Sequence, residues 1–414
     1  MSFPRFKLRA ILSLAFCLSL RASAGPTAEW RLIDPLTQRG WEHFYNNEFD
    51  EAVADFEKEV TTRPDDPEAW NHLAQGVLYL EMDRNGALES QLVTGNNPFL
   101  RRAKLEISPE DKTRFLNALA KATSLSQAQL EKDPKNIQAL YALSVVQGLR
   151  SNYLFLVEKA WVDALKAASS ARKFSNKILE IDPTFVDTNI VQGLDNYIVG
   201  SLPVYMRALG FVAGVHGDRE AGIKELQMVA DRGILSKWDA RILLAAIYRR
   251  ERRSQDAIPL VKGLAERFPR NYLFPLELVQ MYSDVGNKDA ALATLADVER
   301  KRKDAMAGYK RLPEEKILYL RGNVLFWYDD FGAALTNLQQ ATSNVENLDL
   351  GTAQLAWFRQ GQTLDLLNRH QEAIPAYQQA AKISTQSDIG NEAKGYISNP
   401  YHRKVNRLPT EKHG

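Results

Sequence analysis

Residues 357–364 read WFRQGQTL, and residues 372–380 read EAIPAYQQA. In each segment a small residue is followed three or four positions later by a large one: Gly361 by Leu364, and Ala373 by Tyr377. Because residues three and four apart share one face of an α-helix, the pattern predicts two helices that pack closely as a hairpin. The small residues let the two backbones approach, and the large neighbours fill the space between them.

This pair of segments is one of several copies. Small residues occupy the first-helix position at Gly40, Gly193, Gly322 and Gly361, and the second-helix position at Ala52, Ala257, Ala334 and Ala373. The shortest interval between successive copies is 34 residues, from Ala257 to Ala291. Self-similarity at such an interval predicts a stacked array of helix hairpins rather than independent globular domains.

Proline marks where the second helix of a hairpin ends. These steps are Arg63-Pro64, Asp133-Pro134, Asp182-Pro183 and Phe268-Pro269. Proline cannot continue a helix, and it disfavours helical backbone in the residue before it. Apolar residues recur at intervals of three and four, and the alternation typical of strands is missing outside the loops. The sequence therefore predicts an all-α chain.

The repeat offsets and closing prolines resemble those of the tetratricopeptide repeat (TPR) family. This resemblance implies a right-handed superhelical solenoid of antiparallel helix hairpins, whose first helices line a concave surface. TPR proteins that hold carboxylate-terminated peptides use a Lys/Asn/Arg set at defined offsets. The corresponding positions here include Thr37, Trp41 and Asn71, which argues against that peptide specificity.

The array is expected to be irregular over about 83–235. A polar insertion follows Asp83, and helices expected at roughly 110–132, 136–150 and 153–181 exceed the usual repeat length. Residues 186–300 resemble a divergent TPR family that has outer-mitochondrial-membrane and inclusion-body-clearance members. The matching steps are Ser-Leu-Pro at 201–203 and Gly-Asp-Arg-Glu-x-Gly at 217–222. The N-terminal half departs from that family, so a mitochondrial role does not carry over.

The N-terminus has the layout of a secretory signal. Three basic residues within positions 5–9 precede an apolar run from Ala10 to Leu20, and Ala22 and Ala24 follow at the positions that a signal peptidase reads. The run is too short for the ~20 residues that span a bilayer. We expect residues 1–24 to be cleaved, which leaves no transmembrane segment and a net charge of −2. The expected location is a bacterial periplasm or cell envelope, or the medium after secretion.

Two further segments complete the predicted organisation. Residues 25–387 are expected to form the TPR-like domain, and residues 388–414 a flexible basic tail. In that tail Gly390, Gly395 and the Asn399-Pro400 step disfavour helix, and Lys and Arg outnumber Glu.

The sequence offers no catalytic, metal or cofactor motif. The single cysteine, Cys17, lies in the segment expected to be removed, and no histidine has a His or Cys partner three or four residues away. Neither a nucleophile motif of the form Gly-x-Ser-x-Gly nor a complete phosphate loop occurs. Charge balance, with 53 Lys and Arg against 51 Asp and Glu in 414 residues, does not suggest nucleic-acid binding. We therefore predict that the protein is not an enzyme.

The predicted function is a non-catalytic scaffold that binds a protein or peptide in the concave groove. By repeat offset, the groove is lined by Asn71, Gln75, Arg249, Tyr319, Asn323, Phe358 and Arg359. A one-residue slip of the offsets would instead place Tyr319 inside its own hairpin. The alternative is an enzyme or small-ligand carrier with a pocket around 190–220, where glycines accompany Tyr197 and Tyr205.

Overall fold

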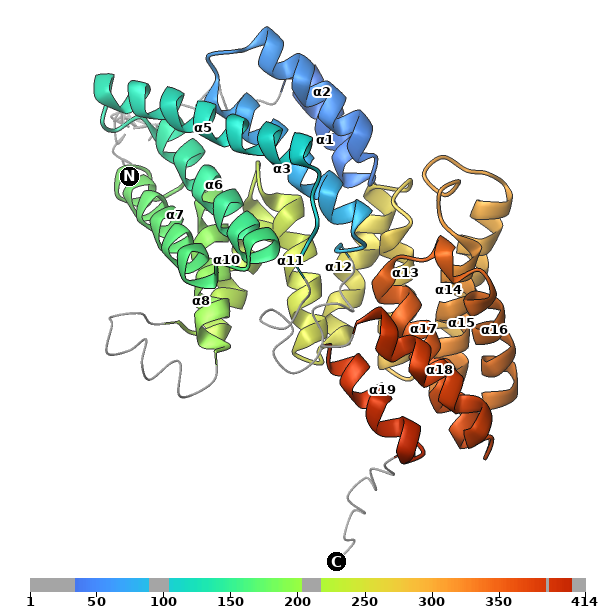
Figure 1. Ribbon diagram of the computed structural model, residues 1–414. Helices are drawn as coiled ribbons and strands as arrows, with labels where there is room; N and C mark the ends of the chain where they lie inside the picture. The colour runs from blue at the N-terminus through green and yellow to red at the C-terminus, as the bar shows by residue number, and fades with distance from the viewer. Residues whose placement is uncertain (1–33, 89–103, 203–216, 385–386, 404–414) are drawn as a thin grey trace, which may run out of the picture. The chain divides into compact units, whose positions relative to one another are not determined.

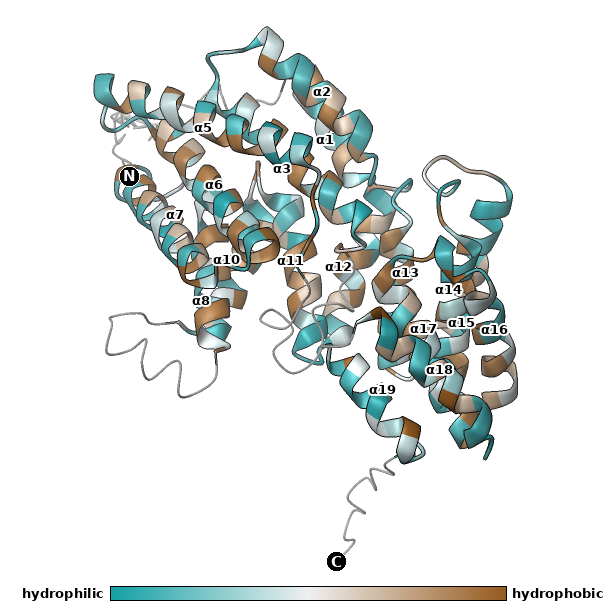
Figure 2. Cartoon of the chain, in the orientation of Figure 1, coloured by the Kyte–Doolittle hydropathy of each residue, from teal (hydrophilic) through white to brown (hydrophobic). Residues whose placement is uncertain are grey.

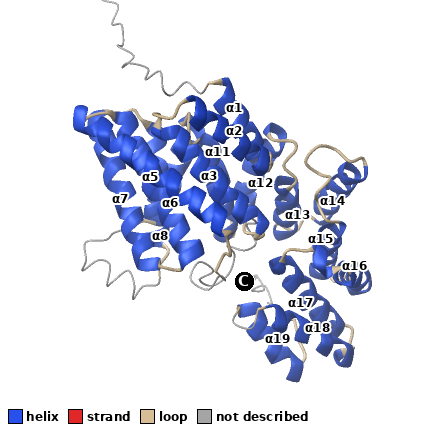
Figure 3. Ribbon diagram, turned by 45° about the horizontal axis from the view of Figure 1, so that its top comes forward, coloured by secondary structure: helices blue, strands red, loops and turns tan. Residues whose placement is uncertain are grey.

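The computed structural model describes residues 34–88, 104–202, 217–384 and 387–403, and its regular structure is helical (Figures 1 and 3). Within these ranges no strand occurs, as the sequence predicted. The predicted signal peptide lies outside them. None of the described helices combines the length and the apolar character needed to cross a membrane.

The described residues form 17 α-helices. The N-terminal eight are α1 (Pro35–Tyr45), α2 (Phe49–Thr62), α3 (Pro67–Arg84), α5 (Pro109–Lys132), α6 (Ile137–Tyr153), α7 (Trp161–Ile181), α8 (Asn189–Gly200) and α10 (Arg219–Arg232). The remaining nine are α11 (Lys237–Arg250), α12 (Ser254–Arg267), α13 (Leu273–Asp284), α14 (Lys288–Lys303), α15 (Glu314–Trp327), α16 (Phe331–Ser343), α17 (Leu350–Leu366), α18 (His370–Ile383) and α19 (Asp388–Ser398).

Local chemistry explains where these helices begin and end. Side-chain oxygens of Asp34, Asp66, Ser108 and Asp349 accept hydrogen bonds from backbone N–H groups in the first turns of α1, α3, α5 and α17. Asp218 caps α10 in the same way. Helices α2, α5, α7 and α12 each end two residues before the proline that the sequence marks as a stop.

Each helix packs on the next along the chain, and the strongest pairings join α6 to α7, α17 to α18, α8 to α10, α15 to α16 and α3 to α5. The first helices α13, α15, α17 and α19 also contact one another in succession. Hydrophobic and hydrophilic residues alternate around these helices (Figure 2). Hairpins that stack through their first helices form an all-α superhelical fold, which confirms the predicted fold class.

The small residues predicted from the repeat lie where helices approach most closely. A Cβ atom on Gly361 would lie 2.6 Å from Cε1 of Tyr377, and one on Gly322 would lie 2.7 Å from Cγ of Leu338. On the partner helices, Ala334 and Ala373 are fully buried. These glycines and alanines therefore allow the close helix contacts that the repeat offsets predict.

The irregular section differs in detail from its prediction. The third long helix begins at Trp161 rather than near residue 153, because a π-helical turn (Leu154–Glu158) intervenes. Lys159 follows that turn with a positive φ of 57°, a left-handed backbone that ends the helical path. The polar insertion lies mostly within 89–103, outside the described residues.

The predicted flexible tail needs correction at its start. Residues 388–398 form α19, which packs on α18 and α17 and buries Ala393 completely. Ser387 caps the helix at Gly390, so the glycine that suggested a break lies in a capped first turn. Gly390 is also needed for close approach, since a Cβ there would lie 1.9 Å from the carbonyl oxygen of Ser384. Residues 404–414 of the predicted tail lie outside the described ranges.

Candidate functional site

Two of the predicted groove residues meet between neighbouring repeats. Nε of Arg359 on α17 donates a 2.9 Å hydrogen bond to Oδ1 of Asn323 on α15. Nη1 of the same guanidinium donates a 2.8 Å bond to Oε1 of Gln362, one turn further along α17. Because α15 and α17 belong to successive hairpins, these bonds fix Arg359 on the surface formed by first helices.

Aromatic rings support the same guanidinium from α15. Its carbon lies 4.2 Å from the ring centroid of Phe326 and 4.8 Å from that of Trp327. Phe326 is fully buried, whereas Trp327 is 50% exposed. Stacking on an aromatic face stabilises a guanidinium while leaving its N–H edge able to donate. The arrangement therefore presents a fixed, flat cation beside an accessible indole.

Among the described residues Arg359 has no ion-pair partner, although the charge of Glu392 on α19 acts on it at longer range. Burial lowers the pKa of Arg359. The charge of Arg403 lowers this pKa further, whereas Tyr319 and Tyr401 raise it. An arginine nevertheless stays protonated in proteins. A partly buried cation without an ion-pair partner attracts a carboxylate or a carbonyl oxygen.

The segment 399–403 crosses the ends of α15 and α17. The backbone N–H of Tyr401 donates a 2.7 Å hydrogen bond to Oδ2 of Asp365. The guanidinium of Arg403 pairs with the carboxylate of Asp329 and donates a 2.6 Å bond to the carbonyl oxygen of Phe326. It also lies 4.9 Å from the ring centroid of Phe326 and 5.6 Å from that of Trp327. Both arginines of the site therefore lie over the same aromatic pair.

Asp365 is held in place by a buried network. Its Oδ2 accepts a 2.7 Å hydrogen bond from the hydroxyl of Tyr377, and its Oδ1 lies 2.7 Å from Nδ1 of His370. Burial, together with the hydrogen bond to Asp365, raises the pKa of Tyr377 far above its ordinary value. The tyrosine therefore remains a donor, and the carboxylate is oriented toward the backbone of Tyr401.

Two other predicted groove residues lie beneath this surface. Tyr319 is 3% exposed and belongs to the core around α13–α15, while Phe358 is 6% exposed. The ring of Phe358 packs against those of Tyr377 and Tyr396, with centroids 6.2 and 5.9 Å away. In this structure neither side chain is open to a partner; both support the helix packing under Arg359.

The remaining three predicted residues make contacts elsewhere in the chain. Asn71 is 1% exposed, and its Nδ2 donates to the carbonyl oxygen of Ala142, which joins α3 to α6. Arg249 forms ion pairs of 3.1 and 3.2 Å with Glu277 and Asp284, which join α11 to α13. Gln75 is half-buried on α3. Their binding roles stay predictions, since these contacts do not bring them to Arg359.

Sequence reasoning missed several residues of the site. These are Trp327, Asp329, Asp365, Tyr401 and Arg403. The glycines and the Asn-Pro step of the tail pointed to flexibility, although a proline also favours the extended backbone that the tail adopts at Asn399. For Asp329 and Asp365 no sequence signal separates them from the other acids of the chain.

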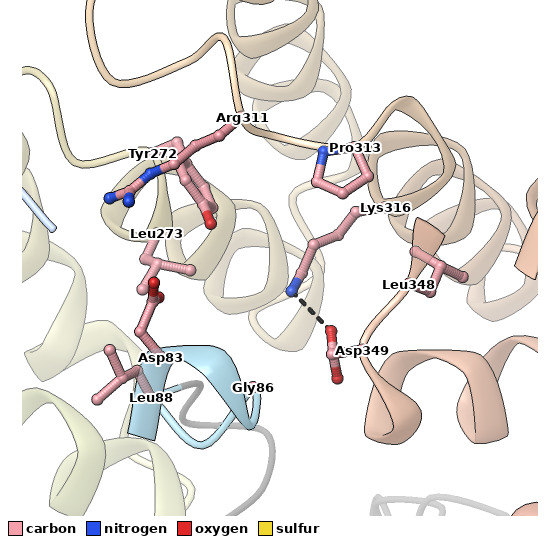
Figure 4. Close-up of a pocket in the computed structure, with 10 residues that line it drawn as sticks. All are labelled: Asp83, Gly86, Leu88, Tyr272, Leu273, Arg311, Pro313, Lys316, Leu348 and Asp349. Carbon is pink, nitrogen blue, oxygen red and sulfur yellow. Dashed lines mark hydrogen bonds and ion pairs between the residues drawn. The ribbon is translucent and has the colours of Figure 1, made fainter. Parts of the chain in front are cut away.

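A cavity of about 210 Å³ lies near the start of α15 (Figure 4). Lys316 points toward Asp349 across it, and their side chains form a 3.0 Å ion pair. Burial raises the pKa of Asp83 at the opposite wall, and Arg311 and Lys316 oppose that rise. Its lining residues come from α3, α13, α15 and the residues around the cap of α17, so the cavity lies where these helices meet.

The pocket predicted around 190–220 is described only in part, because residues 203–216, Tyr205 among them, lie outside the described ranges. Tyr197 is buried, and its hydroxyl donates a 2.9 Å hydrogen bond to Glu251. A Cβ on Gly222 would lie 2.5 Å from the carbonyl oxygen of Gly193. These two glycines thus permit the contact between α8 and α10, and a ligand role for the region stays a prediction.

Among the described residues no group of three or more His, Cys, Asp or Glu side chains could hold a metal ion.

Comparison with known proteins agrees with the repeat offsets. The tetratricopeptide repeat family matches residues 37–75 and 319–388, which include Asn323 and Arg359. The matched residues include none of 186–300, so the resemblance of that stretch to a divergent family stays a prediction. No curated protein matches the chain significantly.

Several solved structures are similar at low sequence identity. Yeast Tom70 is 14% identical with a TM-score of 0.39, and the match covers 88% of each chain. Human IFIT1, in a dimer with m7Gppp-AAAA, is 13% identical with a TM-score of 0.44, over 89% of this chain and 82% of that one. A tetratricopeptide repeat protein from Parabacteroides merdae is 14% identical with a TM-score of 0.32, over 78% and 97% of the two chains.

Proposed function

We propose that this chain, a tetratricopeptide repeat protein, is a non-catalytic scaffold that binds an extended segment of a protein partner across α15, α17 and α19. The repeat family supports the scaffold role, since stacked hairpins present a continuous surface of first-helix side chains. The observation that carries the proposal is the guanidinium of Arg359, which is held in place and has no ion-pair partner within the described ranges.

The chemistry of the site suits an extended peptide better than it suits a flat protein surface. Arg359 is oriented by Asn323 and Gln362, so little side-chain freedom is lost when a carboxylate or carbonyl oxygen binds it. Trp327 supplies a large exposed ring beside it. Arginine and tryptophan are the side chains most often found at energetic centres of interfaces.

A partner-capture measurement tests the proposal. The partner recovered on the intact protein from envelope extract is purified, and its affinity is measured for the unchanged chain and for Arg359→Ala. We expect at least a tenfold loss, about 1.4 kcal/mol, because a fixed charged donor is removed. Arg369→Ala is the matched control, since that arginine is exposed just before α18 and paired with Glu372. An unchanged affinity in Arg359→Ala would remove the site from the binding surface.

We also propose that the scaffold acts outside the cytoplasm. The support is the order of basic residues, apolar run and small residues over positions 1–24. Export from a bacterial cytoplasm would place the groove in the periplasm, at the cell envelope or in the medium.

A further inference from the structure

The segment Asn399–Arg403 makes the contacts of a bound peptide. Asn399 has φ −128° and ψ 106°, which is extended backbone, and Pro400 prevents α19 from continuing. The segment then offers one backbone N–H to Asp365 and one guanidinium to Asp329 and the carbonyl oxygen of Phe326. A backbone donor and a side-chain cation, two residues apart, are thus both bound by fixed groups of α15, α17 and the turn after α15.

The receiving groups are shaped for an arginine. A carboxylate and a carbonyl oxygen accept its N–H groups, while the rings of Phe326, Trp327 and Phe331 lie within 4.9–5.6 Å of its carbon. A planar guanidinium can use the acceptors at its edge and the rings at its face together, whereas an ammonium cannot. Asp329 is also built into the turn, since its φ of 63° is left-handed, a conformation that Asp and Asn tolerate better than other non-glycine residues.

The tail satisfies this site incompletely. Nε of Arg403 is buried without a hydrogen-bond partner among the described residues. The pair with Asp329 is open to solvent, with side chains 25% and 69% exposed. Arg403 also lies over the aromatic pair that Arg359 uses, so two like charges are close together. An occupant held by exposed and imperfect contacts can be replaced by another segment of the same chemistry.

We propose that the surface formed by Asp329, Asp365 and the Phe326–Trp327 rings recognises an arginine in an extended peptide, and that residues 399–403 are its resident occupant. A partner carrying such an arginine displaces the tail. This inference rests on the proposed function, because it names the partner chemistry of the same surface.

The test uses the intact chain and a fluorescently labelled, C-terminally amidated peptide with the sequence of residues 397–403, ISNPYHR. Binding is followed by fluorescence anisotropy. In the unchanged protein the tail competes with the probe. Arg403→Ala weakens the tail, so we expect the probe to bind that variant at least tenfold more tightly. His402→Ala is the matched control, since His402 is exposed on the same segment and should leave the affinity unchanged.

Two further variants test the recognition chemistry. Replacing the arginine of the probe by alanine should weaken its binding to the Arg403→Ala chain at least tenfold. Adding Asp329→Asn to that chain should do the same, while the amide preserves the tolerance for a left-handed turn. Equal probe affinity for Arg403→Ala and the unchanged chain overturns the proposal, and so does binding that survives loss of the probe's arginine.

A measurement on the unchanged protein covers the case in which Arg403→Ala does not fold. Excess probe should then speed amide hydrogen exchange at Tyr401, whose N–H is released from Asp365, and no change at saturating probe overturns the inference. The two proposals fail separately. Loss of partner binding in Arg359→Ala without any tail effect keeps the scaffold function and removes the arginine site. Displacement of the tail by the probe, together with partner binding that is unchanged in Arg359→Ala, keeps the arginine site and contradicts the proposed function.

Discussion

The guanidinium carbon of Arg359 lies 4.2 Å from the ring centroid of Phe326, although the two residues belong to successive repeats. The contact exists because α15 and α17 are stacked as first helices of neighbouring hairpins. The stacking also brings Asn323 to Arg359 and leaves Trp327 at the surface. The proposed partner site is therefore a product of the repeat geometry, and changes that disturb helix stacking should disturb it.

Gly361→Ala should destabilise the protein. The added Cβ would lie 2.6 Å from Cε1 of Tyr377, whose ring is fully buried and cannot easily move. Overpacking of this kind costs ~1–3 kcal/mol, which outweighs the ~1 kcal/mol that alanine gains over glycine in a helix. Thermal unfolding should show a lower melting temperature. Gly148→Ala in α6 is the control, because a Cβ there meets nothing within 4 Å and should raise the melting temperature.

Ala373→Leu should lower the melting temperature more than Gln379→Leu on the same helix. Ala373 is fully buried against the α17 side of its hairpin, in the core that contains Phe358 and Tyr377. Gln379 is exposed, so a larger apolar side chain there meets little. The expected costs are ~1–3 kcal/mol and within ~0.5 kcal/mol, respectively. Equal tolerance of both changes would mean that the helix faces are assigned incorrectly.

The small residues were predictable because sterics at a helix contact admit few alternatives. A glycine facing Tyr377 and an alanine facing α17 leave a periodic trace in the sequence, and their burial confirms it. Tyr319 and Phe358 were less predictable, because the inner and outer edges of a first helix differ by one residue. Their burial shows that both aromatic side chains turn toward the core.

The contribution of the tail could not be predicted from local sequence. Gly390, Gly395 and Pro400 carry turn signals, yet α19 forms because tertiary contacts bury Ala393 and bring Tyr396 against Phe358. Arg403 meets Asp329 across 74 residues of sequence. Nothing in the composition of either segment encodes that pairing.

Asp239→Asn should change how stability depends on pH. Burial, reinforced by the charge of Asp187 and opposed by a hydrogen bond from Tyr45, raises the pKa of Asp239 to about 7. An unfolded aspartate titrates near 3.9, so the folded state holds the proton more tightly. The stabilising contribution is then complete below about pH 3.9 and is lost as the pH rises to about 7.

The stability difference between the Asp239→Asn variant and the unchanged chain should therefore grow in favour of the variant from pH 5 to pH 7 and then level off. Denaturant unfolding at fixed pH values measures this difference. A difference that stays constant from pH 5 to pH 8 would show that the Asp239 carboxyl titrates normally.

Export predicts the first residue of the mature chain. Cleavage after Ala24 leaves Gly25 at the N-terminus, because Ala22 and Ala24 supply the small side chains that the peptidase requires. N-terminal sequencing of protein from the envelope fraction checks it. Recovery of the chain from the cytosol with Met1 intact would refute the export proposal.

Site-specific photo-crosslinking at position 327 tests the central proposal, partner binding beside Arg359, most directly. A photoreactive phenylalanine derivative replaces Trp327, which is half-exposed beside Arg359, and in a second protein it replaces Leu116, which is 41% exposed on α5. We expect one adduct of defined mass at position 327, its loss when Arg359→Ala is added, and no such adduct at position 116. An adduct at position 327 that persists in the Arg359→Ala background, or equal capture at both positions, would contradict partner binding at this site.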